Sequence, residues 1–225
     1  MRVDPGDGRV SAGEIFDRLG EILRKNALPA GGCVVALTAL NVALDTFWND
    51  LSWSNMATAT APALLASLTA QYYLTYAALD RQGLREPGAR KRFIAFLRLN
   101  LLSGIAILLG YILFVLPGLY LSVRWALAST ILLARDGRAG NPLRESWART
   151  KPAFWAIFGT LLVILVPACV VAVGLAATVG ESFPILSSSL AYLFLFASFV
   201  TSWLAGVAIY SLLQTDQDAL AEVFA

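Results

Sequence analysis

The sequence contains no histidine, and this absence excludes several classes of site at once. Without an imidazole there is no Ser-His-Asp or Cys-His triad, no histidine acting as general acid or base, and few ways to build a zinc site. Cysteine is also scarce. Cys33 and Cys169 both fall in apolar runs and are too few for a disulfide framework, so we interpret them as small hydrophobic residues.

Charge is the second shortage, because only 14% of the 225 residues are charged. A soluble domain carries about 25%. The net charge of +2 gives no support to nucleic-acid binding. Enzyme motifs are missing too: Gly83 and Gly88 have the spacing of a phosphate-binding loop, but Ala89 stands where that loop needs lysine. We therefore expect no catalytic residue, no metal site and no cofactor.

Apolar residues make up 58% of the chain and gather in long runs. A helix needs about 20 apolar residues to cross a bilayer. Six segments approach or exceed that length: 27–47, 61–79, 93–116, 118–134, 153–179 and 186–213. The sequence therefore predicts an all-α fold, a polytopic membrane helix bundle of six transmembrane helices arranged as three hairpins. Its parts would be an N-terminal segment 1–26, a membrane domain 27–213 and a tail 214–225.

The basic residues predict the orientation of this bundle. With six spans, every one of the 17 Lys and Arg residues except Arg124 falls on one side of the membrane, and the loops 48–60 and 180–185 have none. The positive-inside rule then makes both termini cytoplasmic. This separation requires a tight outer turn at Pro117-Gly118. Residues 1–26 mix acids and bases without an apolar run, so we do not expect a signal peptide.

Two short amphipathic helices are expected on the cytoplasmic side. Ser11 and Glu14 form a capping-box pattern that opens the first, and its apolar residues share one face at helical spacing. Asn141 and Pro142 suit the start of the second, over 141–151. Such helices can lie in the headgroup plane. The basic residues of this side predict contacts with anionic lipid, through Arg144, Arg149, Lys151, Lys91 and Arg92.

Arg124 lies well inside its expected span, and Asp45 lies near the outer end of the first one. An arginine at the bilayer centre costs about 3 kcal/mol even on insertion scales, so a partner should offset that cost. Asp45 is the only acid within any span, and we predict that it pairs with Arg124, with Asn41 and Tyr120 as further partners. Two alternatives stay open: a structural ion pair, or a site for a substrate or a lipid phosphate.

Other polar or small residues within the spans also allow two interpretations. Polar side chains in the second and third spans either hydrogen-bond a neighbouring helix or line a polar pathway; they are Gln71, Tyr72, Tyr73, Tyr76 and Asn100. In the last span, Ser198, Ser202 and Gly206 recur every four residues. Such a ridge lets helices approach closely, either within the chain or between two copies of it.

The sequence also resembles a known family in several motifs. They are Leu116-Pro117-Gly118-Leu119-Tyr120-Leu121, Val123-Arg124-Trp125, Leu143 to Lys151, Phe154 to Gly159 and the opening Gly13 to Asn26. These resemble the membrane domain of glycerophosphoryl diester phosphodiesterase-type proteins and related six-helix bacterial inner-membrane proteins. The diesterase activity of that family belongs to a separate domain with histidines, so the resemblance implies a membrane module and no hydrolase.

Two functions follow as expectations. The first is a non-catalytic, multi-pass protein of the bacterial inner (cytoplasmic) membrane that organises lipids or partner proteins. The alternative is a transporter or flippase-like component, in which Arg124 would contact a small anion or a lipid phosphate. The expected partners are anionic lipid headgroups on the cytoplasmic face, a membrane protein, or a second copy of the chain through Ser198, Ser202 and Gly206.

Overall fold

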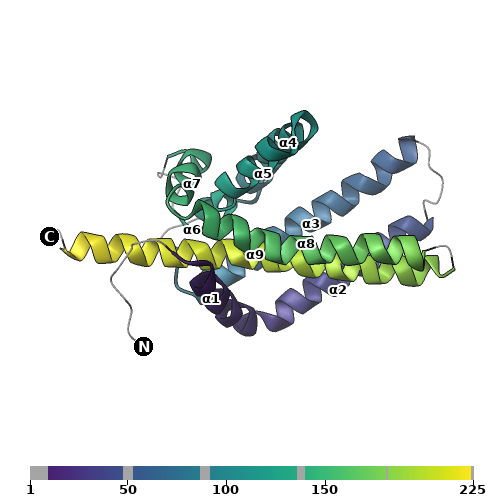
Figure 1. The fold of residues 1–225 in the computed structure, drawn as a ribbon, viewed down its shortest axis with the longest axis horizontal. Helices are drawn as coiled ribbons and strands as arrows, with labels where there is room; N and C mark the ends of the chain where they lie inside the picture. The colour runs from purple at the N-terminus through teal and green to yellow at the C-terminus, as the bar shows by residue number, and fades with distance from the viewer. Residues whose placement is uncertain (1–9, 48–52, 87–91, 136–139, 181, 224–225) are drawn as a thin grey trace.

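A computed structural model describes residues 10–47, 53–86, 92–135, 140–180 and 182–223, without the side chains of 53–59 and 216–223. All regular secondary structure in these ranges is helical, as the sequence predicts. The helices, in chain order, are α1 (Ala12–Lys25), α2 (Ala27–Phe47), α3 (Trp53–Arg81), α4 (Phe93–Leu113), α5 (Val115–Arg124), α6 (Ala128–Ala134), α7 (Pro142–Thr150), α8 (Phe154–Thr178) and α9 (Pro184–Val223) (Figure 1).

Helix α9 organises the fold. Its 40 residues correspond to a length of about 60 Å. It packs against α8 along most of that length and also contacts α2, α1, α3 and α6 (Figure 1). The α4–α5 hairpin stands away from this group and joins it at its base. Helix α9 continues through residue 213 without a break, into the segment expected as the tail.

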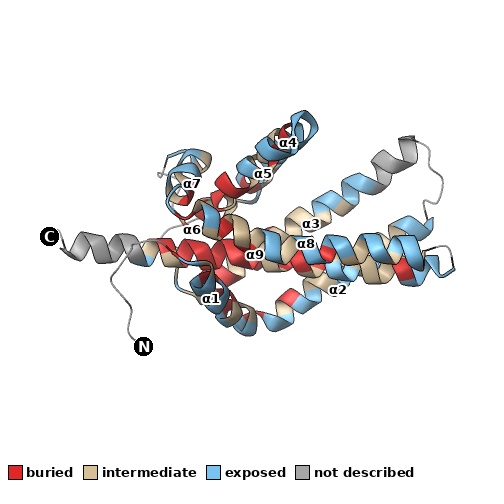
Figure 2. Cartoon of the chain, viewed as in Figure 1, coloured by how far each residue is buried: buried red, intermediate tan, exposed pale blue. Residues whose placement is uncertain are grey.

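The buried core lies towards one end of the molecule, where α1, α6 and α7 meet the C-terminal half of α9 (Figure 2). Helix α1 begins with the expected capping box: Ser11 Oγ accepts from the Glu14 amide and the Glu14 carboxylate accepts from the Ser11 amide. The apolar face of α1, formed by Ile15, Leu19 and Ile22, is buried within this core. This corrects the idea that the face lies on lipid, since α9 and α8 cover it.

Five helical segments of the described chain are long and apolar enough to cross a membrane: Ala27–Phe47, Phe93–Leu113, Val115–Ala134 (α5 and α6 together), Phe154–Thr178 and Pro184–Thr215. Large apolar side chains along them are exposed, among them Leu108, Ile112 and Val170. A soluble monomer rarely exposes such continuous apolar surface. These features indicate a multi-pass membrane protein. Helix α3 has the length but falls outside this set, because its threonines, tyrosines and Gln71 lower its hydropathy.

The α4–α5 hairpin turns three residues earlier than expected. Helix α4 ends at Leu113, Phe114 is extended, and α5 begins at Val115, so Pro117 and Gly118 lie in the first turn of α5 and do not form the loop. Proline is tolerated there because the first amides of a helix lack partners anyway. Gly118 is needed for close packing, since a Cβ at this position would lie 2.5 Å from the Tyr111 ring.

Candidate functional site

A break in the helix separates α5 from α6, and the amino-acid composition of this segment does not predict it. Helix α5 ends at Arg124 and α6 begins at Ala128, although the intervening residues, Trp125 to Leu127, include neither glycine nor proline. Two buried hydroxyls of α7 contact a backbone carbonyl at this break. Ser146 Oγ donates to the Arg124 carbonyl at 2.7 Å, and Thr150 Oγ1 approaches the same carbonyl at 3.4 Å. Docking of α7 therefore stabilises the break.

The Arg124 side chain also bonds α7. Its Nη1 donates to the Trp147 carbonyl at 3.3 Å, and its Nη2 donates to Tyr120 Oη at 2.8 Å. The guanidinium carbon lies 5.0 Å from the centres of the Tyr120 and Trp147 rings and 5.6 Å from that of Phe154. We call Tyr120, Trp147 and Phe154 the aromatic box. Each ring face attracts a cation by about 0.5–1 kcal/mol, and more where water is excluded.

The predicted ion pair between Arg124 and Asp45 is not formed. Arg124 bonds within the aromatic box, whereas Asp45 accepts a hydrogen bond from Tyr192 Oη at 2.7 Å. The break in the helix supplies the physical reason. It places the guanidinium beside Phe154, the first residue of α8, so that the charge lies at the end of a spanning helix and not at its centre. Two acceptors and three rings replace the expected carboxylate.

Arg124 is also enclosed. Its exposed fraction is 7%, and its Nε is buried without a hydrogen-bond partner. Guanidinium carries five N–H donors, of which two are used here. The contacts favour the structural alternative, in which Arg124 holds α5 and α7 together.

Of the five basic residues predicted to contact lipid, some have partners within the protein and others are exposed. Arg149 belongs to a structural network: it pairs with Glu145 at 2.8 Å and lies over the Tyr210 ring. Glu145 also pairs with Arg135 at 2.6 Å, and this hydrogen bond raises the pKa of Arg135. Arg92 is half-buried before α4 and makes a further interaction, and Lys91 lies outside the described residues.

The remaining two form an exposed stripe on α7. Arg144, Trp147 and Lys151 recur at spacings of three and four residues, so they share one face of the helix, and all three are exposed. Neither Arg144 nor Lys151 makes an ion pair with a described residue. Trp155, just beyond, is 78% exposed. We call Arg144, Trp147 and Lys151 the basic stripe.

The polar residues of α3 and α4 mostly form an aromatic cluster. Tyr72 is buried and packs its ring against Tyr73, Tyr76, Phe93 and Phe96. Asn100 donates from its side chain to the Phe96 carbonyl of its own helix at 3.0 Å, and Gln71 lies half-buried. The rings thus pack α3 against α4, whereas Asn100 bonds its own helix and the buried Tyr72 Oη has no hydrogen-bond partner among the described residues, so both the bond to a neighbouring helix and the polar pathway stay predictions.

The small-residue ridge on α9 packs within the chain at its C-terminal end. A Cβ on Gly206 would lie 3.2 Å from Thr130 Oγ1 of α6 and 3.4 Å from the Ala126 carbonyl. Ser198 is buried as well, and Ser202 is partly buried. Gly206 is therefore covered by the chain's own α6 and is not free to contact a second copy.

We compared the chain with protein-family models, with curated proteins and with solved structures, and none of them matches it. Among the described residues there is no group of three or more His, Cys, Asp or Glu that could hold a metal ion. The sequence analysis missed Ser146 and Thr150 as partners of the Arg124 backbone carbonyl, and Tyr192 as the partner of the Asp45 carboxylate. The spacing of Ser146 and Thr150, four residues apart in a polar helix, could have indicated a shared hydrogen-bonding face. No sequence pattern indicates the contact between Tyr192 and Asp45, because 147 residues separate them.

Proposed function

We propose that this protein is a non-catalytic, multi-pass protein of the bacterial inner membrane, with six spans and cytoplasmic termini, that binds anionic lipid through its cytoplasmic surface. The inner-membrane location rests on the resemblance to the membrane domain of glycerophosphoryl diester phosphodiesterase-type proteins. The lipid function rests on the basic stripe of α7.

Contacts between helix ends support six spans. Arg81, at the end of α3, donates to Asn26 Oδ1 at 2.6 Å, so α3 returns to the level at which α2 begins. Similarly, the Glu86 amide donates to the Ala134 carbonyl at 2.8 Å, so the chain that leaves with α4 returns with α6. If α2 crosses a membrane, α3 must cross it back despite its lower hydropathy.

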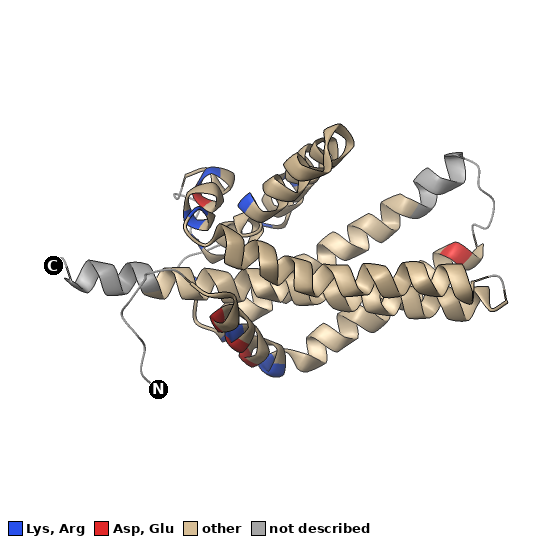
Figure 3. Cartoon of the chain, in the orientation of Figure 1, with Lys and Arg blue, Asp and Glu red and all other residues tan. Residues whose placement is uncertain are grey.

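The distribution of charge supports the orientation. Most described Lys and Arg residues lie at the end of the molecule that carries α1 and α7, and the opposite end shows none (Figure 3). That opposite end corresponds to the loops 48–60 and 180–185, which contain neither Lys nor Arg. By the positive-inside rule, the end with α1 and α7 is cytoplasmic.

The observation that carries the lipid function is the exposure of Arg144 and Lys151, which form no ion pair with any described residue, on the same helical face as Trp147. Tryptophan favours the membrane interface, and each basic residue near an anionic surface contributes about 1 kcal/mol. Two bases therefore correspond to about 2 kcal/mol, or about thirtyfold in affinity. Arg124, which a carrier would use to contact its anion, is enclosed by the aromatic box, and this favours the lipid function over transport.

The test compares two double variants of equal charge. Arg144→Gln/Lys151→Gln removes the basic stripe, and Arg24→Gln/Arg98→Gln removes two other exposed bases. Native mass spectrometry of the purified protein with phosphatidylglycerol and phosphatidylcholine measures lipid retention. We expect the first variant to weaken phosphatidylglycerol binding by about tenfold or more, and the second much less. An equal loss in both variants, or no preference for phosphatidylglycerol in the parent protein, would contradict the proposal.

A further inference from the structure

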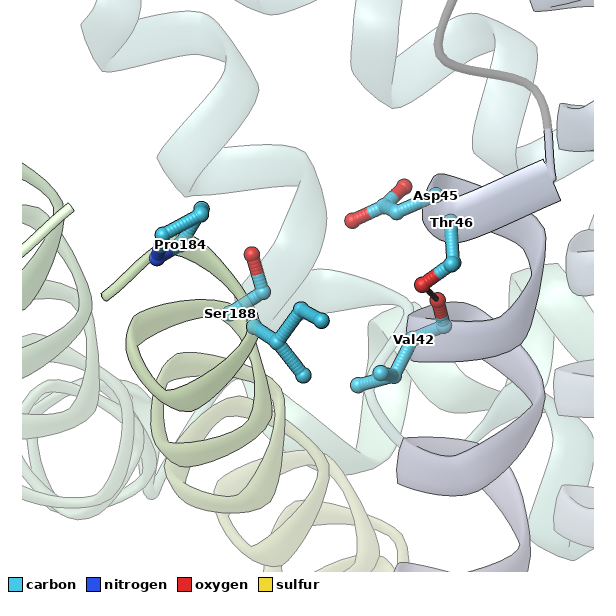
Figure 4. A pocket seen from close by; sticks show the side chains of 6 residues that line it. Val42, Asp45, Thr46, Pro184 and Ser188 are labelled. Carbon is cyan, nitrogen blue, oxygen red and sulfur yellow. Dashed lines mark hydrogen bonds between the residues drawn. The ribbon is translucent and has the colours of Figure 1, made fainter. Parts of the chain in front are cut away.

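A cavity of about 240 Å³ opens at the end of the molecule opposite to α1 and α7, between the last turns of α2 and the first turns of α9 (Figure 4). Its lining residues are Val42, Asp45, Thr46, Pro184, Ile185 and Ser188. The cavity thus brings together an ionisable carboxylate, two hydroxyls and an apolar wall from segments that are far apart in the sequence.

The carboxylate of Asp45 has no cationic partner among the described residues. Its Oδ2 accepts the hydrogen bond from Tyr192, which fixes the orientation of the group and leaves Oδ1 without a described partner. The chain offers no other source of positive charge nearby, because the adjoining loops 48–60 and 180–185 lack Lys and Arg. The partial charges of the neighbouring helix ends have opposite signs, negative at the end of α2 and positive at the start of α9, and largely offset each other.

The hydroxyls add acceptors to the cavity. Thr46 Oγ1 donates its proton to the Val42 carbonyl at 2.8 Å, so its lone pairs remain available to accept. Ser188 Oγ is a further acceptor. With Asp45 Oδ1 there are three acceptor oxygens around the cavity, which equals the number of N–H donors on a primary ammonium group. Val42, Pro184 and Ile185 provide apolar surface for the methylene groups next to such a nitrogen.

We infer that this cavity binds a primary ammonium group, held by Asp45 and oriented by Thr46 and Ser188. A divalent metal ion suits the cavity less well, because Ca²⁺ takes about six to eight oxygen ligands and the cavity has a single carboxylate. A quaternary ammonium group lacks N–H donors and could not use the hydroxyls. The same chemistry has two sources, the headgroup of phosphatidylethanolamine or a free amine such as ethanolamine.

The experiment uses the full chain in detergent micelles. Isothermal titration compares ethanolamine with choline, and native mass spectrometry compares phosphatidylethanolamine with phosphatidylcholine of the same acyl chains. We expect the primary amine to be preferred by about tenfold, and Asp45→Asn to abolish that preference. Ser188→Ala should weaken it, whereas Ser189→Ala should leave it unchanged, since Ser189 bonds the Ile185 carbonyl of its own helix and does not line the cavity.

Each outcome bears on the inference. Binding of ethanolamine supports a free amine as the ligand, and retention of phosphatidylethanolamine alone supports the lipid. Equal binding of choline or phosphatidylcholine, full competition by Mg²⁺ or Ca²⁺, or no binding of either amine would overturn the inference. If Asp45→Asn fails to fold, the comparison of Ser188→Ala with Ser189→Ala decides the matter, and equal binding by those two variants would overturn it.

Discussion

Replacement of Arg124 by lysine separates the geometry of the aromatic box from its charge. Both side chains are cationic, so the replacement retains the charge and changes its shape and hydrogen-bonding geometry. Lysine has a single ammonium group and cannot bond Tyr120 Oη and the Trp147 carbonyl while it lies over three rings. A hydrogen bond that involves a charged group contributes about 1.5–3 kcal/mol. Loss of one such bond and part of the ring contacts predicts a loss of about 2 kcal/mol in the free energy of unfolding.

Unfolding in mixed micelles by dodecyl sulfate, followed by far-UV circular dichroism, measures this loss. Arg98→Lys is the matched control, because Arg98 is exposed on α4 and makes no described ion pair. We expect that control to stay within about 0.5 kcal/mol of the parent protein. If Arg124→Lys also stays within that range, the aromatic box does not hold α5 to α7.

A double-mutant cycle with Tyr120→Phe localises the effect to one bond. Tyr120→Phe removes the acceptor that Arg124 Nη2 reaches at 2.8 Å and retains the ring. In the arginine background this should cost about 1 kcal/mol or more, and in the lysine background much less. The coupling energy is expected to be about 1 kcal/mol. Hydrogen bonds inside membranes average about 0.6 kcal/mol, so a coupling near zero would mean that water replaces this bond.

Three further predictions concern stability. Ser146→Ala leaves the last carbonyl of α5 without its donor at 2.7 Å and should lower the free energy of unfolding by about 1–2 kcal/mol, measured by the same titration. Gly118→Ala should lower the melting temperature because its methyl group would lie 2.5 Å from a tyrosine ring, whereas Gly104→Ala meets no atom within 4 Å and should not. The hydrogen bond from Lys25 lowers the pKa of Glu21. The contribution of ionised Glu21 to stability is therefore present above pH 4.5 and is lost as the pH falls through the lowered pKa. Melting of Glu21→Gln should therefore depend less on pH between 6 and about 3 than that of the parent protein.

Local signals in the sequence predict much of the fold correctly. The capping box at Ser11 and the N-cap at Asn141 both form where the pattern places them. Each of these depends on residues within one turn of a helix, so no knowledge of the tertiary structure is needed. Helical spacing alone does not fix every ion pair: Arg18 stands four residues after Glu14, yet Glu14 serves the capping box and Arg18 bonds Glu21, Ser211 and Gln82.

Long-range contacts account for what the sequence could not predict. Trp125 to Leu127 have good helix-forming composition, and only the hydroxyls of α7 show that the chain breaks there. Asp45 finds Tyr192 across 147 residues, and no spacing rule connects them. The apolar face of α1 was expected on lipid because amphipathicity shows which face is buried but not what covers it.

The break after Arg124 shows why the sequence misplaced its charge. Counting residues along an unbroken helix places Arg124 well inside the membrane, where a cation costs about 3 kcal/mol and would need a carboxylate. In the structure, α5 ends at Arg124, and the guanidinium meets the middle of α7 and the first residue of α8. The charge then lies where α7 supplies the Trp147 carbonyl and α5 supplies the Tyr120 hydroxyl. Asp45 is no longer needed to neutralise it, and this leaves the Asp45 carboxylate, at the opposite end of the spans, to recognise a cation from outside the chain.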